Sequence, residues 1–456
     1  MVTTGLIAID ATILATAVPT IVDELGGFEA FPWLFSVYLL AQAVSVPVYA
    51  KLSDVVGRKP IILIGIGLFL LGSILCGFAW SMPALIAFRA VQGLGAGAVQ
   101  PMAITIAGDI YTLQERAKTQ GYLASVWAIS SVVGPTLGGV FSQFVSWRWI
   151  FFVNIPLCIL AAVLLIRAFH EKIEKREHKV DYAGAMLLTV SLTLLILGVL
   201  EGGQAWAWNS PQSIAVFAVG AVLLVAFLFV ERRAAEPVLP LWVFRHRVVG
   251  AAMATSLVVG VLLLGLTSYV PLFAQGVLGT GAIVAGFALA AMTIGWPIAA
   301  ATSGRFYLRF GFRTTMLIGS LIALAGAALL LTVDASSSAL HLAAPNFVMG
   351  LGFGYASSPA IIAAQSSVGW ERRGVATGAT LFARSVGSAV GVAAFGAIAN
   401  SVVRTNLGSE PTSLEDLPAG VLDPAIHAVF IASFVVAVTL VVAAAFMPKE
   451  VVEVTG

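Results

Sequence analysis

Apolar residues run in long stretches along the whole chain, and short polar segments separate one stretch from the next. An α-helix needs about 20 apolar residues to cross the hydrocarbon core of a bilayer. Such stretches recur fourteen times, so the pattern predicts fourteen membrane-spanning helices and an all-α polytopic membrane protein. We place the spans at 3–23, 31–50, 61–80, 83–108, 119–144, 149–168, 182–201, 212–231, 248–270, 280–303, 314–333, 339–363, 375–400 and 424–447.

Composition agrees with this interpretation and excludes several classes of protein. Of the 456 residues, 59% are apolar and 10% charged, whereas about a quarter are charged in ordinary soluble domains. The net charge of +2 gives no reason to expect nucleic acid as a partner. Cys76 and Cys158 lie in apolar runs without metal-ligand spacing, so neither a disulfide nor a metal site is expected. The GLGAG segment at 93–97 follows no strand and no Walker lysine follows it, so we expect neither a nucleotide cofactor nor an enzyme.

The distribution of Lys and Arg predicts the topology. With the N-terminus inside, 20 of the 24 basic residues fall in cytoplasmic segments, and Arg148 and Arg404 alone fall outside. Because cytoplasmic loops of membrane proteins are enriched in Lys and Arg, both termini should lie in the cytoplasm of a plasma-membrane protein. The first run carries Asp10 and Pro19 without a basic leader, which favours a span over a cleaved signal peptide.

An internal repeat divides the chain. Segment 50–59 is similar to 304–313, and GLGAG at 93–97 matches GLGFG at 350–354. The repeat predicts two six-helix bundles at 1–169 and 248–456, with a two-helix insert and its cytoplasmic linkers at 170–247 between them. Two halves of one topology are typical of transporters, in which the substrate lies near the bilayer midplane between the halves.

Two charges lie deep within predicted spans, Asp10 in the first and Arg89 in the fourth. A charge at that depth costs at least about 2.5–3.5 kcal/mol, so each needs a compensating role. The residues Gln92, Gly93, Ala96 and Gln100 follow Arg89 at helical spacing and form one polar, small-residue face. The pair is either a proton-coupling site, with Asp10 as the carrier, or a structural ion pair; a water-exposed charge is a further alternative.

Two further motifs lie in the turn between spans 2 and 3 and within span 5. Asp54, Gly57, Arg58 and Lys59 occupy the short turn between spans 2 and 3, where glycine suits a tight turn. There the carboxylate could cap a helix start or pair with an arginine. In span 5, Gly134 and Pro135 with Gly138 and Gly139 predict a kink beside a face on which helices approach closely.

Other polar or aromatic residues within spans are candidates for a substrate cavity. Packing is the favoured interpretation of Trp127, with substrate contact as the alternative. Most other tryptophans, including Trp147, are expected in an interfacial aromatic belt. Glu231 lies at a span end, where a carboxylate is expected to reach water. The cavity candidates are Gln42, Gln92, Gln100, Trp127, Asn346 and Arg384.

These motifs together resemble the major facilitator superfamily, in particular its fourteen-helix drug:proton antiporter branch of multidrug exporters. The resemblance rests on 9–19, 50–59, 89–93, 134–139 and 147–156 and runs along essentially the whole chain. It implies that Asp10 and Arg89 serve proton coupling, that Asp54 serves gating, and that the span-5 motif belongs to an exporter. Ala50, Val55 and Leu308 depart from the family pattern, and span 10 lacks an acidic residue that some members use for divalent cationic drugs.

The expected function is therefore secondary active transport. The leading hypothesis is a proton-coupled antiporter, monomeric and in contact with membrane lipids, that exports amphipathic small molecules such as drugs, antibiotics or lipid-like compounds by alternating access. An uptake symporter of the same fold is the alternative within transport. A non-transporting membrane receptor is a third hypothesis, which the absence of a large extramembrane domain disfavours.

Overall fold

The computed structural model describes residues 1–14, 17–26, 33–171, 181–202, 206–234, 237–407 and 418–451. Lys172, Lys175, Arg176 and Lys179 of the basic linker lie outside these ranges, as does the side chain of Arg404. Within them the structure is helical, and β pairing is confined to one isolated bridge between Gly202 and Trp206.

Every predicted apolar stretch coincides with helix. The elements are α1 (Val2–Ile13), α2 (Val18–Leu25), α3 (Trp33–Val56), α4 (Arg58–Gly77), α5 (Met82–Ile110), α6 (Leu113–Phe144), α7 (Trp149–Phe152), α8 (Asn154–Ala168), α9 (Tyr182–Glu201), α10 (Pro211–Glu231), α11 (Trp242–Arg245), α12 (Arg247–Leu272), η3 (Phe273–Val277), α13 (Ala282–Phe310), α14 (Phe312–Leu330), α15 (Ala339–Ser366), η4 (Trp370–Arg372), α16 (Arg373–Leu407) and α17 (Ala419–Ala445).

Eleven helices among the described residues are long and apolar enough to cross a membrane. The protein is thus a multi-pass membrane protein. Three predicted spans fall short by this measure: α6, α9 and the first, which consists of two short helices, α1 and α2, rather than one. Pro19 lies in the first turn of α2, where a missing backbone N–H is tolerated.

The two copies of the repeated turn share one backbone feature. Gly57 precedes α4 with φ 104°, and Gly311 precedes α14 with φ 83°. L side chains rarely adopt positive φ, so glycine is required where the chain reverses between two antiparallel helices. The sequence similarity of 50–59 to 304–313 therefore has a structural cause.

The glycine triplets also make equivalent contacts in both halves. Gly93 and Gly97 of α5 lie against α3, while Gly95 between them lies against α4. Gly350 and Gly354 of α15 lie against α13, and Gly352 lies against α14. A methyl group at any of these six positions would come within about 2.0–2.6 Å of a neighbouring helix or side chain. Small residues at this spacing let three helices approach closely in each half.

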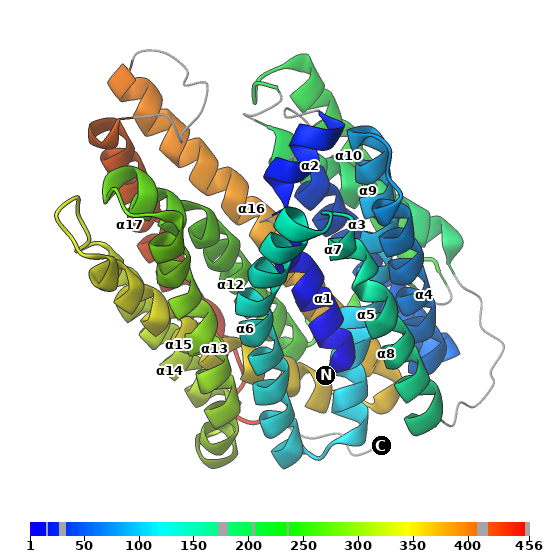
Figure 1. The fold of residues 1–456 in the computed structure, drawn as a ribbon. Coiled ribbons are helices and arrows are strands. Elements are labelled where there is room, and N and C mark those ends of the chain that lie inside the picture. Colours follow the sequence, from blue (N-terminus) through cyan, green and yellow to red (C-terminus); the bar gives the residue numbers. More distant parts are fainter. Residues whose placement is uncertain are drawn as a thin grey trace.

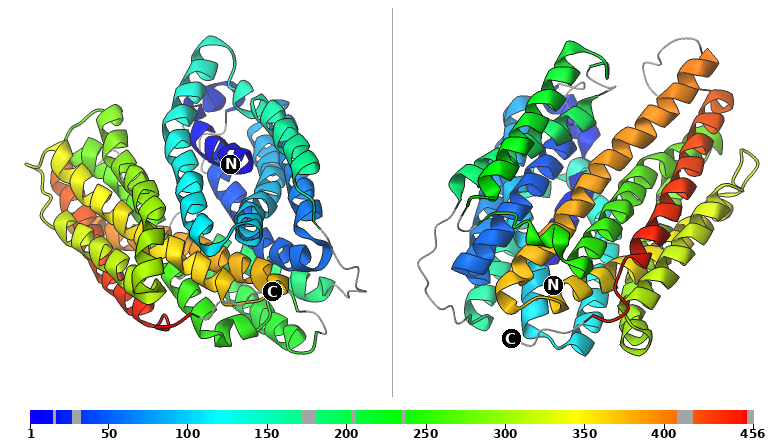
Figure 2. Two further views of the ribbon diagram at one scale, coloured as in Figure 1. Left: turned by 90° about the horizontal axis from the view of Figure 1, so that it is seen from below. Right: turned by 180° about the vertical axis from the view of Figure 1, so that it is seen from behind.

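Helices α1–α8 form one group and α12–α17 the other (Figure 1). The groups meet at the end where Asp54 lies, which we call the Asp54 end, and they diverge toward the opposite end, the Trp147 end (Figure 2). Helix α9 packs against α3 of one group and α16 of the other, and α10 packs on α9. Several apolar side chains of α10, such as Val222 and Phe229, are exposed.

Candidate functional site

Asp10 and Arg89 form a buried ion pair. Helix α1 carries Asp10 and α5 carries Arg89, and Arg89 Nη1 donates to Asp10 Oδ2 at 2.8 Å. Both residues are 1% exposed. Because an isolated charge is costly in a low-dielectric interior, this geometry explains how both charges are tolerated at membrane depth.

Two amides complete the hydrogen bonding of the Asp10 carboxylate. Gln92 Nε2 donates to Asp10 Oδ1 at 2.8 Å, and Asn154 Nδ2 donates to the same oxygen at 3.0 Å. Both amides also donate to the Ser73 hydroxyl oxygen, at 2.8 and 3.3 Å. Helices α5 and α8 therefore donate to the carboxylate of α1, and α4 joins them through the Ser73 hydroxyl. We call Asp10, Ser73, Arg89, Gln92 and Asn154 the carboxylate network.

Arg89 is held on three sides by groups other than Asp10. Its Nη1 donates to Gln92 Oε1 at 2.6 Å, and its Nε donates to the Leu34 carbonyl at 3.2 Å. The guanidinium carbon lies 4.2 Å from the centre of the Tyr38 ring. A planar fork of donors over an aromatic face is a role that arginine fills and lysine does not.

The glycine of the span-5 motif brings α6 against α1 beside this network. Thr12 Oγ1 donates to the Ser130 carbonyl at 2.9 Å, and a methyl group on Gly134 would lie 2.0 Å from that hydroxyl. Gly139 faces open space, so it does not mediate a close approach. Gly138 is buried, and the side chain of Pro135 lies outside the described residues.

Asp54 joins the two helix groups at the Asp54 end. Its carboxylate accepts hydrogen bonds from the backbone N–H groups of Gly374 at 3.0 Å and Val375 at 2.9 Å, at the start of α16. A carboxylate there satisfies backbone donors that have no partner within the helix and lies at the positive end of the helix dipole. Arg58 Nη2 lies 2.9 Å from Asp54 Oδ1.

Arg58 is the centre of the same junction. It is fully buried, its Nε donates to Asp109 Oδ2 at 3.1 Å, and its Nη2 donates to the Trp370 carbonyl at 2.7 Å. Its guanidinium also stacks on the Trp370 ring, 4.0 Å from the centre. Arg373 reaches Asp109 Oδ1 at 3.4 Å from the other group. We call Asp54, Arg58, Asp109, Trp370 and Arg373 the gate cluster.

Further contacts across the junction lie at the same end. Arg116 Nη1 donates to Ser366 Oγ at 2.9 Å, and Tyr307 Oη donates to the Leu113 carbonyl at 3.0 Å. Lys59 is not part of the junction; its Nζ donates to the carbonyls of Ile166 and Phe169 at the end of α8. Glu171 accepts from the backbone N–H groups of Arg58 and Lys59 at the start of α4.

The carboxylate network and the gate cluster are far apart. Tyr38, which stacks on Arg89, and Asp54 both belong to α3 and are sixteen residues apart. At 1.5 Å per residue the two sites are about 24 Å apart along the helix. A change at one can reach the other only through movement of helices such as α3 and α5, which contribute to both.

The cavity candidates do not form one cluster. Gln92 belongs to the carboxylate network, and Gln42 Nε2 donates to Gln100 Oε1 at 2.8 Å between α3 and α5. Trp127 packs against the buried cluster around Leu6 and Ile7. Asn346 is buried and donates to the Leu342 carbonyl at 2.8 Å. Arg384 is half-buried and has no hydrogen bond or ion pair to any described residue.

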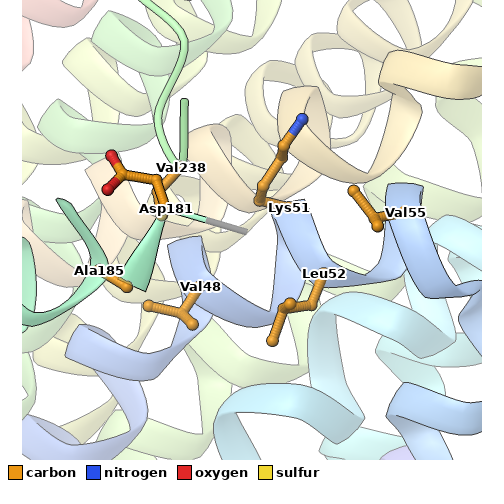
Figure 3. A pocket seen from close by; sticks show the side chains of 7 residues that line it. All are labelled: Val48, Lys51, Leu52, Val55, Asp181, Ala185 and Val238. Carbon is orange, nitrogen blue, oxygen red and sulfur yellow. The ribbon is translucent and has the colours of Figure 1, made fainter. Parts of the chain in front are cut away.

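A small pocket lies elsewhere, on the flank of α3 that faces the α9–α10 hairpin (Figure 3). Lys51 and Asp181 are its polar residues, among apolar side chains such as Val48 and Val238. Nearby, Glu231 is 3% exposed, and its Oε1 accepts the Leu239 backbone N–H at 2.5 Å. The expectation that Glu231 reaches water is therefore wrong, because the chain after α10 folds back over it.

Several residues of these sites were not predicted. Trp147, expected in an interfacial belt, is 1% exposed; its Nε1 donates to Glu24 Oε2 at 2.7 Å. Arg148 Nη1 donates to the other oxygen of Glu24 at 2.5 Å, which explains why Trp and Arg are adjacent here. Ser73, Tyr38 and Glu171 carry no signal in one sequence, since serine, tyrosine and glutamate are common at such positions. No group of three metal-ligating side chains occurs among the described residues.

Comparison with known proteins assigns the chain to a protein family. The model of the Major Facilitator Superfamily matches residues 1–392. Multidrug resistance protein 3 of Bacillus subtilis is 38% identical over 400 residues, which cover 88% of this chain and 78% of that protein. The multidrug transporter protein MdtP of the same organism is 34% identical, with 86% and 73% covered.

A solved structure agrees on the fold. The human organic anion transporter MFSD10 superimposes with a TM-score of 0.65, covering 96% of this chain and 97% of that one, at 13% identity. Together with the family match and the multi-pass helical architecture, this excludes an enzyme. The chain belongs to the Major Facilitator Superfamily and is a membrane transporter.

Proposed function

We propose that the protein is a proton-coupled antiporter that exports amphipathic small molecules by alternating access. The carboxylate network is the observation that carries this proposal. Among the described residues, Asp10 of α1 is the one acidic side chain well inside a span. Side chains of α5 and α8 donate hydrogen bonds to it, and Ser73 of α4 accepts from the two amides among them. The relatives named for multidrug resistance and efflux support export of this class of compound.

Proton binding at Asp10 would require the network to rearrange. Arg89, Gln92 and Asn154 all present N–H donors to the carboxylate. A protonated carboxyl would add an O–H donor to a site that already consists of donors, so at least one neighbour would have to turn away. Because those neighbours lie on different helices, binding and release of a proton would be linked to relative movement of the helices.

The gate cluster would open and close one end of the protein during alternating access. In this conformation the Asp54 end is closed by Asp54, Arg58, Arg373 and their partners, while the helix groups diverge at the other end (Figures 1 and 2). We propose that the Asp54 end faces the cytoplasm of a plasma-membrane protein, as the Lys and Arg distribution predicts, with both termini inside. The structure would then represent an outward-facing state.

The proposed architecture has fourteen spans in a monomer. Six belong to each bundle, 1–169 and 248–456, and two to the insert, 170–247. The equivalent glycine contacts of α5 and α15 support the division into halves. Helix α9 beside α3 and α16, with exposed apolar side chains on α10, supports an insert at the lipid-facing edge.

Reconstituted vesicles under an imposed pH gradient test the proposal. When an amphipathic fluorescent dye is added, the full chain should move protons across the membrane in the direction opposite to dye movement, and the pH of the lumen should change accordingly. Asp10→Asn should abolish this substrate-driven proton movement while the protein stays inserted. Wild-type-like antiport by a well-expressed Asp10→Asn variant would contradict the proposal.

The two alternatives give different outcomes in the same vesicles. An uptake symporter would move dye and protons in one direction, whereas a non-transporting receptor would move neither. Neither alternative has an observation of its own in the structure. The resemblance of 134–139 to an export motif, together with Gly134 at the α1–α6 contact, favours the antiporter.

A further inference from the structure

Four helices from both groups meet in a small apolar cluster just beyond the gate cluster. It consists of Val46 on α3, Ile104 on α5, Ile361 on α15, and Leu381 and Phe382 on α16. We call these five residues the apolar plug. Contacts of Asp54 with Gly374 and of Ala50 with Gly378 lie between the plug and the Asp54 end.

One helical turn from the plug, toward the Trp147 end, each of these helices carries a polar residue. Four residues before Val46, Ile104 and Ile361 are Gln42, Gln100 and Ser357, and three after Leu381 is Arg384. Helices α3, α5 and α15 run toward the Asp54 end and α16 runs away from it, so all four steps point the same way. Residues three or four apart lie on the same helix face, so each of these four lies on the face that carries the plug, one turn beyond it. We call the four residues the polar ring.

The ring has unused hydrogen-bonding capacity. Gln42 donates to Gln100, but the amide N–H groups of Gln100 make no hydrogen bond within the described residues. The Ser357 hydroxyl is buried and lacks a partner there. Arg384 brings a full positive charge and is likewise unpaired. Buried polar groups are normally hydrogen-bonded, and Ser357 is a buried group without a partner among the described residues. Gln100 and Arg384 are half-buried, so their donors are open to an acceptor that enters from outside.

The charges at membrane depth point to the sign of that acceptor. Asp10 is neutralised by Arg89, which lies eleven residues before Gln100 on α5, or about 16 Å along that helix. Arg384 therefore has no ion-pair partner among the described residues, although a charge within a span is normally found with one. Guanidinium groups pair best with carboxylate, sulfonate or phosphate oxygens, because their donors match that geometry.

From these observations we propose that Gln42, Gln100, Ser357 and Arg384 form the floor of the substrate site and that Arg384 binds an anionic group of the substrate. The apolar part of an amphipathic anion would extend toward the Trp147 end, and the plug would block its way to the gate cluster. This inference rests on the proposed transport function and names its substrate class: amphipathic anions rather than cations.

Binding of three matched probes to the purified full chain tests the proposal. The probes share a dansyl group and an eleven-carbon chain and end in a carboxylate, an uncharged amide or an amine. We expect the wild type to bind the carboxylate probe on the order of tenfold more tightly than the amide, as one charge-assisted pair would give. Arg384→Gln should remove that preference and leave affinity for the amide unchanged.

Two further variants keep the test decisive. Arg309→Gln, which removes an exposed cation near the end of α13, should bind all three probes as the wild type does. Ser357→Asp adds a carboxylate at the same level that offsets the charge of Arg384, so it should abolish the preference for the carboxylate probe, and it remains informative if Arg384→Gln does not fold. Equal affinity of the wild type for carboxylate and amide, or an equal loss for all probes in Arg384→Gln, would overturn the proposal.

Added lipids distinguish the source of the anion. Displacement of the carboxylate probe by phosphatidylglycerol but not by phosphatidylcholine would show that a lipid headgroup uses the site; no displacement would show that the site takes a soluble anion. Either supports anion recognition. Asp10→Asn should retain the carboxylate preference, because it lies outside the ring. If that variant binds normally and the wild type fails to exchange protons, the antiport proposal fails while this one stands.

Discussion

The Asp54 carboxylate on α3 caps the N-terminus of α16 through the backbone N–H of Gly374, at 3.0 Å. Two residues that are 320 positions apart in the chain thus join the two helix groups at one end. The contact requires no side chain at position 374. A methyl group there would lie 2.3 Å from Asp54 Oδ1, so glycine is needed for the approach.

Asp54→Ala should weaken this closure. Loss of a helix cap costs about 1 kcal/mol, which corresponds to roughly fivefold in an equilibrium between two conformations. A cysteine introduced at Ala364, which is fully buried, should react several-fold faster with a water-soluble maleimide in the Asp54→Ala background. Asp334→Ala, in an exposed loop, serves as the control. Identical labelling rates in both backgrounds would show that Asp54 does not hold the Asp54 end closed.

Arg89→Lys should impair coupling although it preserves the charge. Lysine cannot replace the Nη1 contacts to Asp10 and Gln92 together with the Nε contact to Leu34. Each hydrogen bond to a charged group contributes about 1.5–3 kcal/mol, so we expect lower thermal stability and a displaced pH profile of transport. Lower stability with an unchanged pH profile would mean that Arg89 supports the fold alone.

Gly134→Ala should disrupt the α1–α6 contact beside the carboxylate network. The added methyl would lie 2.0 Å from Thr12 Oγ1, and overpacking of this kind costs typically about 1–3 kcal/mol. Gly139→Ala in the same motif is a matched control, since nothing lies within 4 Å of the new methyl. Thr12→Ala should partly restore the stability of Gly134→Ala. Equal melting temperatures for the two glycine variants would contradict this account.

The Trp147 end should lose a local contact on acidification. Hydrogen bonds from Arg148 and Trp147 lower the pKa of Glu24. A carboxylate with a lowered pKa contributes stability above its ordinary pKa, and that contribution disappears as pH falls through the lowered value. Indole fluorescence of Trp147, in a variant whose other tryptophans are replaced, should therefore change in the acid range. With Glu24→Gln the same titration should be flat; a transition that persists would assign it to another group.

Helix α10 should be inaccessible from water along its exposed face. Its outward side chains are apolar, and Val222 is 67% exposed in the absence of lipid. Val222→Cys should react poorly with a charged thiol reagent in membranes, whereas Gln42→Cys should react in at least one conformational state. The native Cys76 and Cys158 are buried and should give little background. Strong labelling at Val222 that substrate prevents would place the insert in the transport pathway.

The positions of the helices could be predicted because each requires a long apolar run, and all fourteen runs fall on helix. The division of the first run into α1 and α2 was missed, although Pro19 was visible in the sequence. The number of helices that cross the bilayer is not fixed in the same way: α9 is as apolar as the other spans, but its described apolar part, Ala183–Val199, is shorter than they are.

The candidate sites could be predicted in part. Asp10, Arg89 and Gln92 stood out because a charge or amide in an apolar run is conspicuous, and the structure brings them together. Asn154 was noticed only within a motif, and Ser73 not at all, because contacts between α4, α5 and α8 depend on helix rotation. Glu24 and Glu231 show the same limit: whether a carboxylate at a span end is covered depends on the chain that follows.

The burial of Asp10 also bears on how well a cell can hold its electrochemical gradient. A carboxylate that is 1% exposed and surrounded by donors has no water from which to exchange a proton in this conformation. If Asp10 carries the proton as proposed, this conformation would act as an insulator and would not dissipate the proton-motive force between transport cycles. Loss of Ser73 or Asn154 would then be detected first as a proton leak.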